Sequence, residues 1–333
     1  MKETNATIGP RLLLRDRIEI IKSKRFFTLA FSLSMLALII IIFGIATNGL
    51  FFKLTSLIEM IDQTIIIGTM AIAVSFIYTT GNLDISVGSV MAMGAMCGVL
   101  VYYSTGNVIL MLAVAVAISL ILMLLNAILS VLLNIKTILV AIVMIQLYGA
   151  IISQVLGPDS LSVDYNICRH LANDGYRYIA FIAYFVFCLI VFRFTSVGRQ
   201  LRFIGGNQRC ATQTGMDSKR LIIISFLMAG IGVGLAATFT IARTASVSTD
   251  TGAAMGMNVM LATVLGGMSI YGGAKSNTYS GVIGALTVSA LNKGMLMVGI
   301  SSMVIQGVRG VIFLLLVFLN SERPSTLPSR TQW

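Results

Sequence analysis

The stretch YTTGNLDISVGS, residues 78–89, places Asp84 together with glycines and hydroxyl-bearing residues between two strongly apolar segments. Those segments, Ile61 to Tyr78 and Val87 to Tyr103, each approach the about 20 apolar residues that cross a hydrocarbon core about 30 Å thick. Non-helical backbone at membrane depth persists only where protein or a water-filled cavity satisfies its polar groups. The stretch therefore predicts a polar connection enclosed by the helices of a membrane protein.

The whole chain has the composition of an integral membrane protein. Of its 333 residues, 57% are hydrophobic and 11% are charged, and the mean hydropathy is +0.95. So few charges cannot cover the surface of a water-soluble globule. Lys and Arg outnumber Asp and Glu by 23 to 12, but basic residues collect at the ends of membrane segments for orientation alone. We therefore expect a lipid membrane around the chain and no nucleic-acid partner.

Ten apolar segments are long enough to predict an all-α, polytopic membrane protein of about ten spanning helices. Residues 1–26 form a basic leader without a cleavage site, residues 27–319 the helical domain and residues 320–333 a tail. The ten segments are Phe27 to Ala46, Ile61 to Tyr78, Val87 to Tyr103, Val108 to Leu133, Ile138 to Leu156, Tyr178 to Phe194, Leu221 to Ala242, Ala253 to Ile270, Tyr279 to Val298 and Ser302 to Leu319.

The basic residues predict how the chain is oriented, because cytoplasmic segments retain positive charge. With ten crossings and a cytoplasmic N-terminus, seventeen basic residues lie inside and four outside, the four being Lys53, Arg169, Arg177 and Arg243. The seventeen include six in the sixth connection and its edges, Arg193 to Arg220. We therefore expect both termini to be cytoplasmic.

No catalytic, metal or nucleotide site is expected in this chain. The four cysteines show no CxxC spacing, and the sole histidine, His170, lies in a loop, Gly157 to Arg177, that is typical of a solvated surface. A phosphate loop would need Lys after its second glycine, but Gly267 and Gly272 are followed by Gly273. Catalysis by a membrane enzyme is disfavoured, since no acid-base set converges.

Four stretches carry glycine and polar residues that a plain spacer would not need. In the first, Asp84 or Ser86 is expected to cap the next helix, to lie beside the transport path, or both. In the second, Thr195 to Arg220, a break at Gly205-Gly206-Asn207 separates two short helical pieces that either lie on the membrane or dock into another protein. Its apolar residues are Leu201, Phe203, Ile204 and Met216.

The third and fourth stretches lie near the C-terminal end. In Leu265 to Leu286, paired glycines are interpreted as small residues that let helices approach closely. In Leu291 to Gly310, four polar or charged residues lie in or near helices: Asn292, Lys293, Gln306 and Arg309. Lys293 and Arg309 either snorkel to an interface or are functional as buried polar groups.

These stretches, in this order, resemble the permease subunits of bacterial ATP-binding-cassette importers for simple sugars, a group that includes the autoinducer-2 permeases. The first resembles the family element G-x-[IL]-D-[IL]-S-V-G-S, and the third, ATVLGGMSIYGG, resembles another. The residues that carry the resemblance, or lie within these elements, are Gly81, Asn82, Asp84, Ser86 and Gly88 in the first stretch, Gly198, Arg199, Gly205, Gly206, Asn207, Ala211, Gly215 and Met216 in the second, Gly266, Gly267, Gly272 and Gly273 in the third, and Asn292 and Gly294 in the fourth.

The resemblance implies one half of a transmembrane pore with the vitamin-B12-importer-like, type II fold, in a bacterial inner membrane. It implies a second permease copy or paralogue, cytoplasmic ATPases that bind the ATP and Mg, and an extracytoplasmic sugar-binding protein, with no cofactor in this chain itself. Thr195 to Arg220 would be the ATPase-coupling loop, and Asn292 and Gln306 would be candidate polar residues of the solute path. The sequence departs from the family at Arg209, usually acidic, at Thr212, usually basic, and in a longer loop after Gly273.

The alternative hypothesis is an ion-coupled secondary transporter of a small polar solute. Such a protein needs charged groups near the membrane midplane and often shows inverted repeats with broken helices. Asp84 is the main acidic candidate here, while Glu59 and Asp62 lie at a segment edge. Dependence of uptake on ATP or on a proton gradient separates the two hypotheses.

Overall fold

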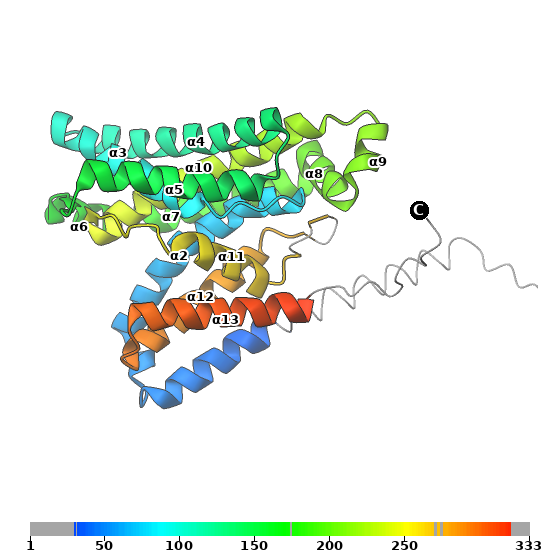
Figure 1. The fold of residues 1–333 in the computed structure, drawn as a ribbon. Coiled ribbons are helices and arrows are strands. Elements are labelled where there is room, and N and C mark those ends of the chain that lie inside the picture. The colour runs from blue at the N-terminus through cyan, green and yellow to red at the C-terminus, as the bar shows by residue number, and fades with distance from the viewer. Residues whose placement is uncertain (1–29, 31, 174, 270–271, 274–275, 321–333) are drawn as a thin grey trace, which may run out of the picture.

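The computed structural model describes residues 30, 32–173, 175–269, 272–273 and 276–320. The predicted leader, and the tail after residue 320, lie outside these residues. The described chain is helical apart from two short strands (Figure 1). Its elements are a first helix Ser32–Ala46, the 3-10 helix η1 (Leu50–Phe52), α2 (Leu54–Thr79), α3 (Val87–Thr105), α4 (Val108–Leu133), α5 (Thr137–Leu156), β1 (Leu161–Ser162), α6 (Tyr165–Asn173), α7 (Tyr176–Phe194), α8 (Ser196–Gly206), α9 (Gln208–Gln213), α10 (Ser218–Thr244), β2 (Ser246–Val247), α11 (Met255–Leu265), α12 (Ser280–Met297) and α13 (Ser302–Asn320).

A helix lies within each of the ten predicted segments, and six of these helices are long and apolar enough to cross a membrane: α2, α3, α4, α5, α7 and α10. Two hydrophobic clusters divide the described chain. The larger one joins α2 to α3, α4, α5, α7, α10, α11 and the first half of α12, and the smaller one joins the first helix and the start of α2 to the second half of α12 and to α13. In Figure 1, α2 runs obliquely from one group of helices to the other.

Helix α2 is the central helix of both groups. It is hydrophobic on all sides, which is the pattern of a helix surrounded by protein, and every residue from Thr64 to Thr79 is buried. By contrast, α4 keeps large apolar side chains such as Ile109 and Leu132 exposed, as expected of a helix that faces lipid. Helix α2 contacts α7, α10, α11 and α12. A displacement of α2 must therefore change its packing against helices of both groups.

The prediction of a continuous spanning helix over residues 253–270 is wrong. Helix α11 has 11 residues, which gives a length of about 16 Å, about half of the hydrocarbon core. Turns occupy the chain from Thr249 to Ala254 before it. These turns pack on the start of α3, because a methyl group on Gly88 would lie 2.4 Å from the carbonyl oxygen of Gly252. Helix periodicity does not reveal where α11 begins, because Ala253 and Ala254 just before it are themselves small and apolar.

The loop predicted to be plain solvated surface, Gly157 to Arg177, contains β1 and α6. Strand β1 pairs antiparallel with β2, with Leu161 opposite Val247. The hydroxyl of Tyr103, near the end of α3, donates to Ser162 O at 2.5 Å. In Figure 1, α6 lies at one end of the molecule and α8 and α9 at the other, so the two ends have distinct structures.

Candidate functional site

Three of the four sequence stretches meet at one point, the C-terminal end of α2. The backbone N–H of Gly273 donates to the carbonyl oxygen of Thr79 at 3.0 Å. On the other side, a methyl group on Gly205 of α8 would lie 1.8 Å from the same oxygen and 2.6 Å from Gly273 N. We call Thr79, Gly205, Gly272 and Gly273 the glycine junction. The glycines were predicted to let helices approach closely. At this point they do allow a close approach, but it is between backbone segments of α8, α2 and the 272–273 loop and not between two helix faces.

The junction needs glycine on both sides. Gly272 and Gly273 have φ values of +72° and +89°, a left-handed conformation that side chains disfavour. A methyl group on Gly272 would lie 2.6 Å from Tyr78 O. Because the contacts are backbone on backbone, no flexible side chain lies between α8 and α2 to absorb a displacement of either. The arrangement can pass a movement of α8 directly to α2.

The structure confirms the predicted break in the second stretch. Helix α8 ends at Gly206 and α9 begins at Gln208, and the side chain of Asn207 between them accepts from Cys210 N at 3.1 Å. The side chain of Thr195 likewise accepts from Gly198 N at the start of α8. These two caps stabilise the starts of both short helices, α8 and α9, which lie at one end of the molecule.

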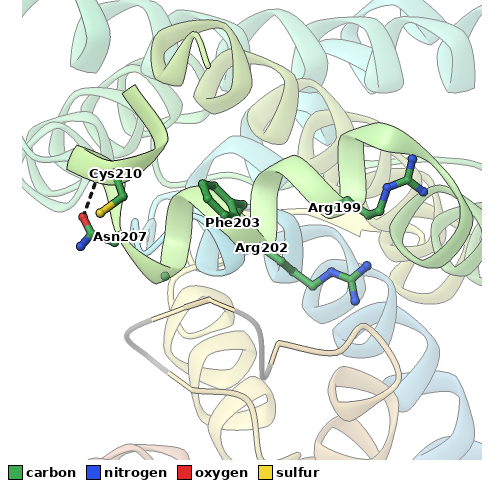
Figure 2. Close-up of a pocket in the computed structure, with 6 residues that line it drawn as sticks. Arg199, Arg202, Phe203, Asn207 and Cys210 are labelled. Atoms are coloured by element: carbon green, nitrogen blue, oxygen red, sulfur yellow. Dashed lines mark hydrogen bonds between the residues drawn. The ribbon is translucent and has the colours of Figure 1, made fainter. Parts of the chain in front are cut away.

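A groove of about 500 Å³ lies on the outer side of α8 and α9 (Figure 2), lined by Arg199, Arg202, Phe203, Gly206, Asn207 and Cys210. Arg199 is exposed. Arg202 is held in place, since it donates to Gly198 O at 3.1 Å and to Phe192 O at 3.2 Å. Leu201 and Ile204 are buried in the chain's own core, whereas Phe203 is 47% exposed. The groove therefore presents a basic surface with one aromatic side chain.

The other residues singled out in this stretch hold the two helices against α7 and α10. A methyl group on Gly198 would lie 2.1 Å from Phe192 O, Ala211 is buried, and Met216 packs on the larger core. Gly215 takes a φ of +81° after α9. Arg209, the site of a family departure, is exposed.

The first stretch is joined to two helices, α4 and α5, by a chain of buried hydrogen bonds. The Asp84 Oδ1 accepts from the backbone N–H of Ser86 at 2.7 Å and from its hydroxyl at 2.6 Å. Ser86 Oγ accepts from Asn126 of α4 at 2.9 Å, and Asn126 Oδ1 accepts from Tyr148 of α5 at 2.8 Å. Sequence reasoning missed Tyr148, because one tyrosine in an apolar helix gives no signal.

The capping prediction for this stretch is only partly right. Ser86 occupies the position before α3, but its side chain makes no capping hydrogen bond. Asp84 instead organises the turn by accepting from the N–H of Ser86. Its carboxyl is 1% exposed, and Oδ2 has no hydrogen-bond partner in the described part of the chain. Burial raises the pKa of this carboxyl to about 6.

The remaining residues of the first and third stretches surround these contacts. Asn82 donates to Thr80 Oγ1 at 2.9 Å, and Gly81 is exposed with a φ of +79°. Gly266 ends α11 against the start of α12, since a methyl group there would lie 1.8 Å from Ser280 O, and Gly267 follows with a φ of +84°. The three glycines, Gly81, Gly266 and Gly267, shape the backbone and offer no ligand group.

The two candidate polar residues of the path have different surroundings. Asn292 is buried and its Oδ1 accepts from the Nε of Arg309 at 2.8 Å. Gln306 is exposed on α13. Arg309, 8% exposed, therefore serves as the partner of Asn292 and does not reach out to an interface as the snorkelling hypothesis supposed.

Comparison with known proteins gives a consistent picture. The chain is 25% identical over 318 residues to the ribose import permease protein RbsC of Escherichia coli strain K12, covering 91% of this chain and 98% of that protein. It is 25% identical over 275 residues to the galactofuranose transporter permease protein YtfT of the same strain, covering 80% of each. It is 28% identical over 307 residues to the autoinducer 2 import system permease protein LsrD of Enterobacter sp. strain 638, covering 87% and 91%.

No solved structure gives a significant match to the chain. A family model described as the permease component of branched-chain amino acid transport systems matches residues 56–319, which is most of the chain. Together with the six apolar helices, this match identifies a multi-pass inner-membrane protein with a transport role. The chain belongs to the family described as the permease component of branched-chain amino acid transport systems, and it is also similar to sugar and autoinducer 2 permeases.

Proposed function

We propose that this chain is the transmembrane permease subunit of an ATP-binding-cassette importer that moves a monosaccharide-like solute. An extracytoplasmic binding protein delivers the solute, and separate cytoplasmic ATPase subunits supply the driving force. The chain works with a second permease copy or a paralogue, crosses the membrane about ten times in the vitamin-B12-importer-like fold, and keeps both termini in the cytoplasm. The turns before α11 and α11 together make the eighth crossing.

The glycine junction is the observation that carries this proposal. It sets the basic coupling loop, residues 195–220, in backbone contact with the end of the central helix. A membrane protein that is driven by a separate ATPase needs a stiff connection between the surface that binds the ATPase and the helices that move in the membrane. The surroundings of Leu201 and Ile204 favour docking over membrane contact, because these apolar residues face the chain's own core and leave Arg199 and Phe203 outside.

The names of the relatives favour a sugar-like solute. Ribose, galactofuranose and autoinducer 2 stand in the names of three of them, whereas the family description names branched-chain amino acids. A weakly binding, mildly polar path suits such a permease, since a separate binding protein does the selecting. The first residues to probe in that path are Asn82, Asp84, Asn292 and Gln306.

The test is solute uptake by cells that make this chain with the ATPase and binding protein encoded beside it. Radiolabelled ribose, arabinose, xylose, galactose and leucine serve as probes, with cells lacking only this chain as the control. Uptake of a sugar that stops on ATP depletion but survives a proton uncoupler supports the proposal. Uptake that stops with the uncoupler while ATP persists supports the ion-coupled alternative, and uptake of leucine alone refutes the solute class.

A further inference from the structure

A group of five charged residues gathers at the end of α2 opposite the glycine junction. Glu59 and Asp62 lie one turn apart on α2, so their side chains share a face of the helix. Around them are Arg177 at the start of α7, Lys293 in α12 and Arg243 near the end of α10. Asp62 and Thr79 are separated by seventeen residues, which corresponds to about 26 Å along the helix. One rigid helix therefore carries the junction at one end and this group at the other.

The two carboxylates join α2 to different helices. Asp62 pairs with Arg177 at 3.3 Å and also accepts from the hydroxyl of Tyr178 at 3.0 Å, and both charged side chains are largely buried. Glu59 pairs with Lys293. The first pair ties α2 to the larger group of helices and the second ties it to the smaller group. Both pairs must be strained or broken if the two groups separate at this end.

The group has one cation more than it has carboxylates. Arg243 is exposed and makes no hydrogen bond or ion pair with the described residues, yet it lies within electrostatic reach of Asp62, Glu59 and Arg177. The Nε of Arg177 is buried without a partner in the same part of the structure. A network built only for stability would satisfy a buried group such as the Arg177 Nε. Arg243 is a second cation near the same carboxylate, so the group offers Asp62 two partners and therefore two arrangements.

We propose that Glu59, Asp62, Arg177, Lys293 and Arg243 form a charge lock that closes this end of the transporter and opens once in each transport cycle. In the arrangement seen here, Asp62 holds Arg177. When α8 moves and pushes on Thr79, α2 shifts, the Glu59–Lys293 pair separates and Asp62 exchanges Arg177 for Arg243. The charge lock rests on the proposed function, because the force reaches it through the coupling loop.

The movement of α2 that the exchange requires is tested by cross-linking in membranes that contain the complete transporter. The cysteines replace the charged groups, so the cross-links report whether α2 lies nearer to α7 or to α10, and the single variants below test the charges themselves. One variant carries Asp62→Cys with Arg177→Cys and a second carries Asp62→Cys with Arg243→Cys, each treated with a short bis-methanethiosulfonate reagent. Trapping the ATPases with MgATP and vanadate should lower the yield of the 62–177 cross-link and raise that of 62–243, each by about fivefold, the scale of a typical coupling between two sites. Yields that stay unchanged would overturn the charge lock.

A matched pair of single variants gives an independent reading. Arg243→Gln should leave the melting temperature of the purified chain unchanged, because Arg243 has no partner in this arrangement, but should reduce uptake by about tenfold. Arg169→Gln on α6 removes an exposed cation outside the group and should change neither quantity. Wild-type uptake by Arg243→Gln would overturn the exchange, whereas failure of the unmodified transporter to take up any sugar would count against the proposed function itself.

Discussion

Adjacent glycines at the end of α8 offer a direct test of the junction, because only one of them touches α2. A methyl group on Gly205 would lie 1.8 Å from Thr79 O, whereas one on Gly206 would meet no atom within 4 Å. Ordinary van der Waals contact begins at 3.4 Å. Gly205→Ala must therefore push α8 and α2 apart by about 1.6 Å, while Gly206→Ala adds the same atom without a clash.

The magnitude follows from two opposing effects. Overpacking of this kind costs about 1–3 kcal/mol, and replacing a helical glycine by alanine returns up to about 1 kcal/mol. We expect Gly205→Ala to lower the free energy of unfolding by about 1–2 kcal/mol. If α8 instead moves away from α2, the loss of stability is smaller, but the contact that transmits the movement is lost. Gly206→Ala should be neutral or should raise the free energy of unfolding by up to about 1 kcal/mol.

The assay compares ATP-dependent uptake and thermal unfolding for the two variants, each produced as the full chain and checked for membrane insertion by immunoblot. Uptake per inserted molecule should fall about tenfold or more in Gly205→Ala, the effect of about 1.4 kcal/mol, and should stay near wild type in Gly206→Ala. Replacing both Gly205 and Gly206 by valine should abolish uptake, and the single variants should show that the loss comes from position 205. If Gly205→Ala and Gly206→Ala transport equally well, the junction does not carry force.

Three further predictions follow from single groups. Because burial raises the pKa of the Asp84 carboxyl from 3.8 to about 6, the folded chain holds that proton more tightly than the unfolded chain. Its thermal stability should therefore fall by about 3 kcal/mol as the pH rises from about 4 to 6; in Asp84→Asn this fall should be absent, and a pH profile like that of wild type would contradict the assignment. Tyr148→Phe leaves the buried Asn126 Oδ1 short of a donor and should cost about 1–3 kcal/mol in thermal unfolding, against a smaller loss for the exposed Tyr103→Phe. Cys210 is exposed, and an impermeant maleimide should label it only after the membrane is opened; labelling of intact cells would reverse the proposed orientation.

The sequence by itself determined the class of protein and most of its helices. Spanning helices are set by the length and apolarity of a local segment, because the membrane demands about 20 apolar residues and internal hydrogen bonds. The break between α8 and α9 was also predictable, since Gly206 and Asn207 act locally. The end of α11 is also marked locally, by Gly266 and Gly267, but the prediction followed the apolarity of residues 253–270 and made the helix too long.

Only the tertiary structure decided which of these stretches touch. Thr79, Gly205 and Gly273 belong to three distant parts of the chain, as do Asp84 and Tyr148, or Glu59 and Lys293. Apolar helix faces in a membrane protein resemble one another and carry little information about their neighbours. Partners are chosen by close packing, by the need to satisfy buried polar groups and by the pairing of a few charges, and these are properties of the assembled helices rather than of any one segment.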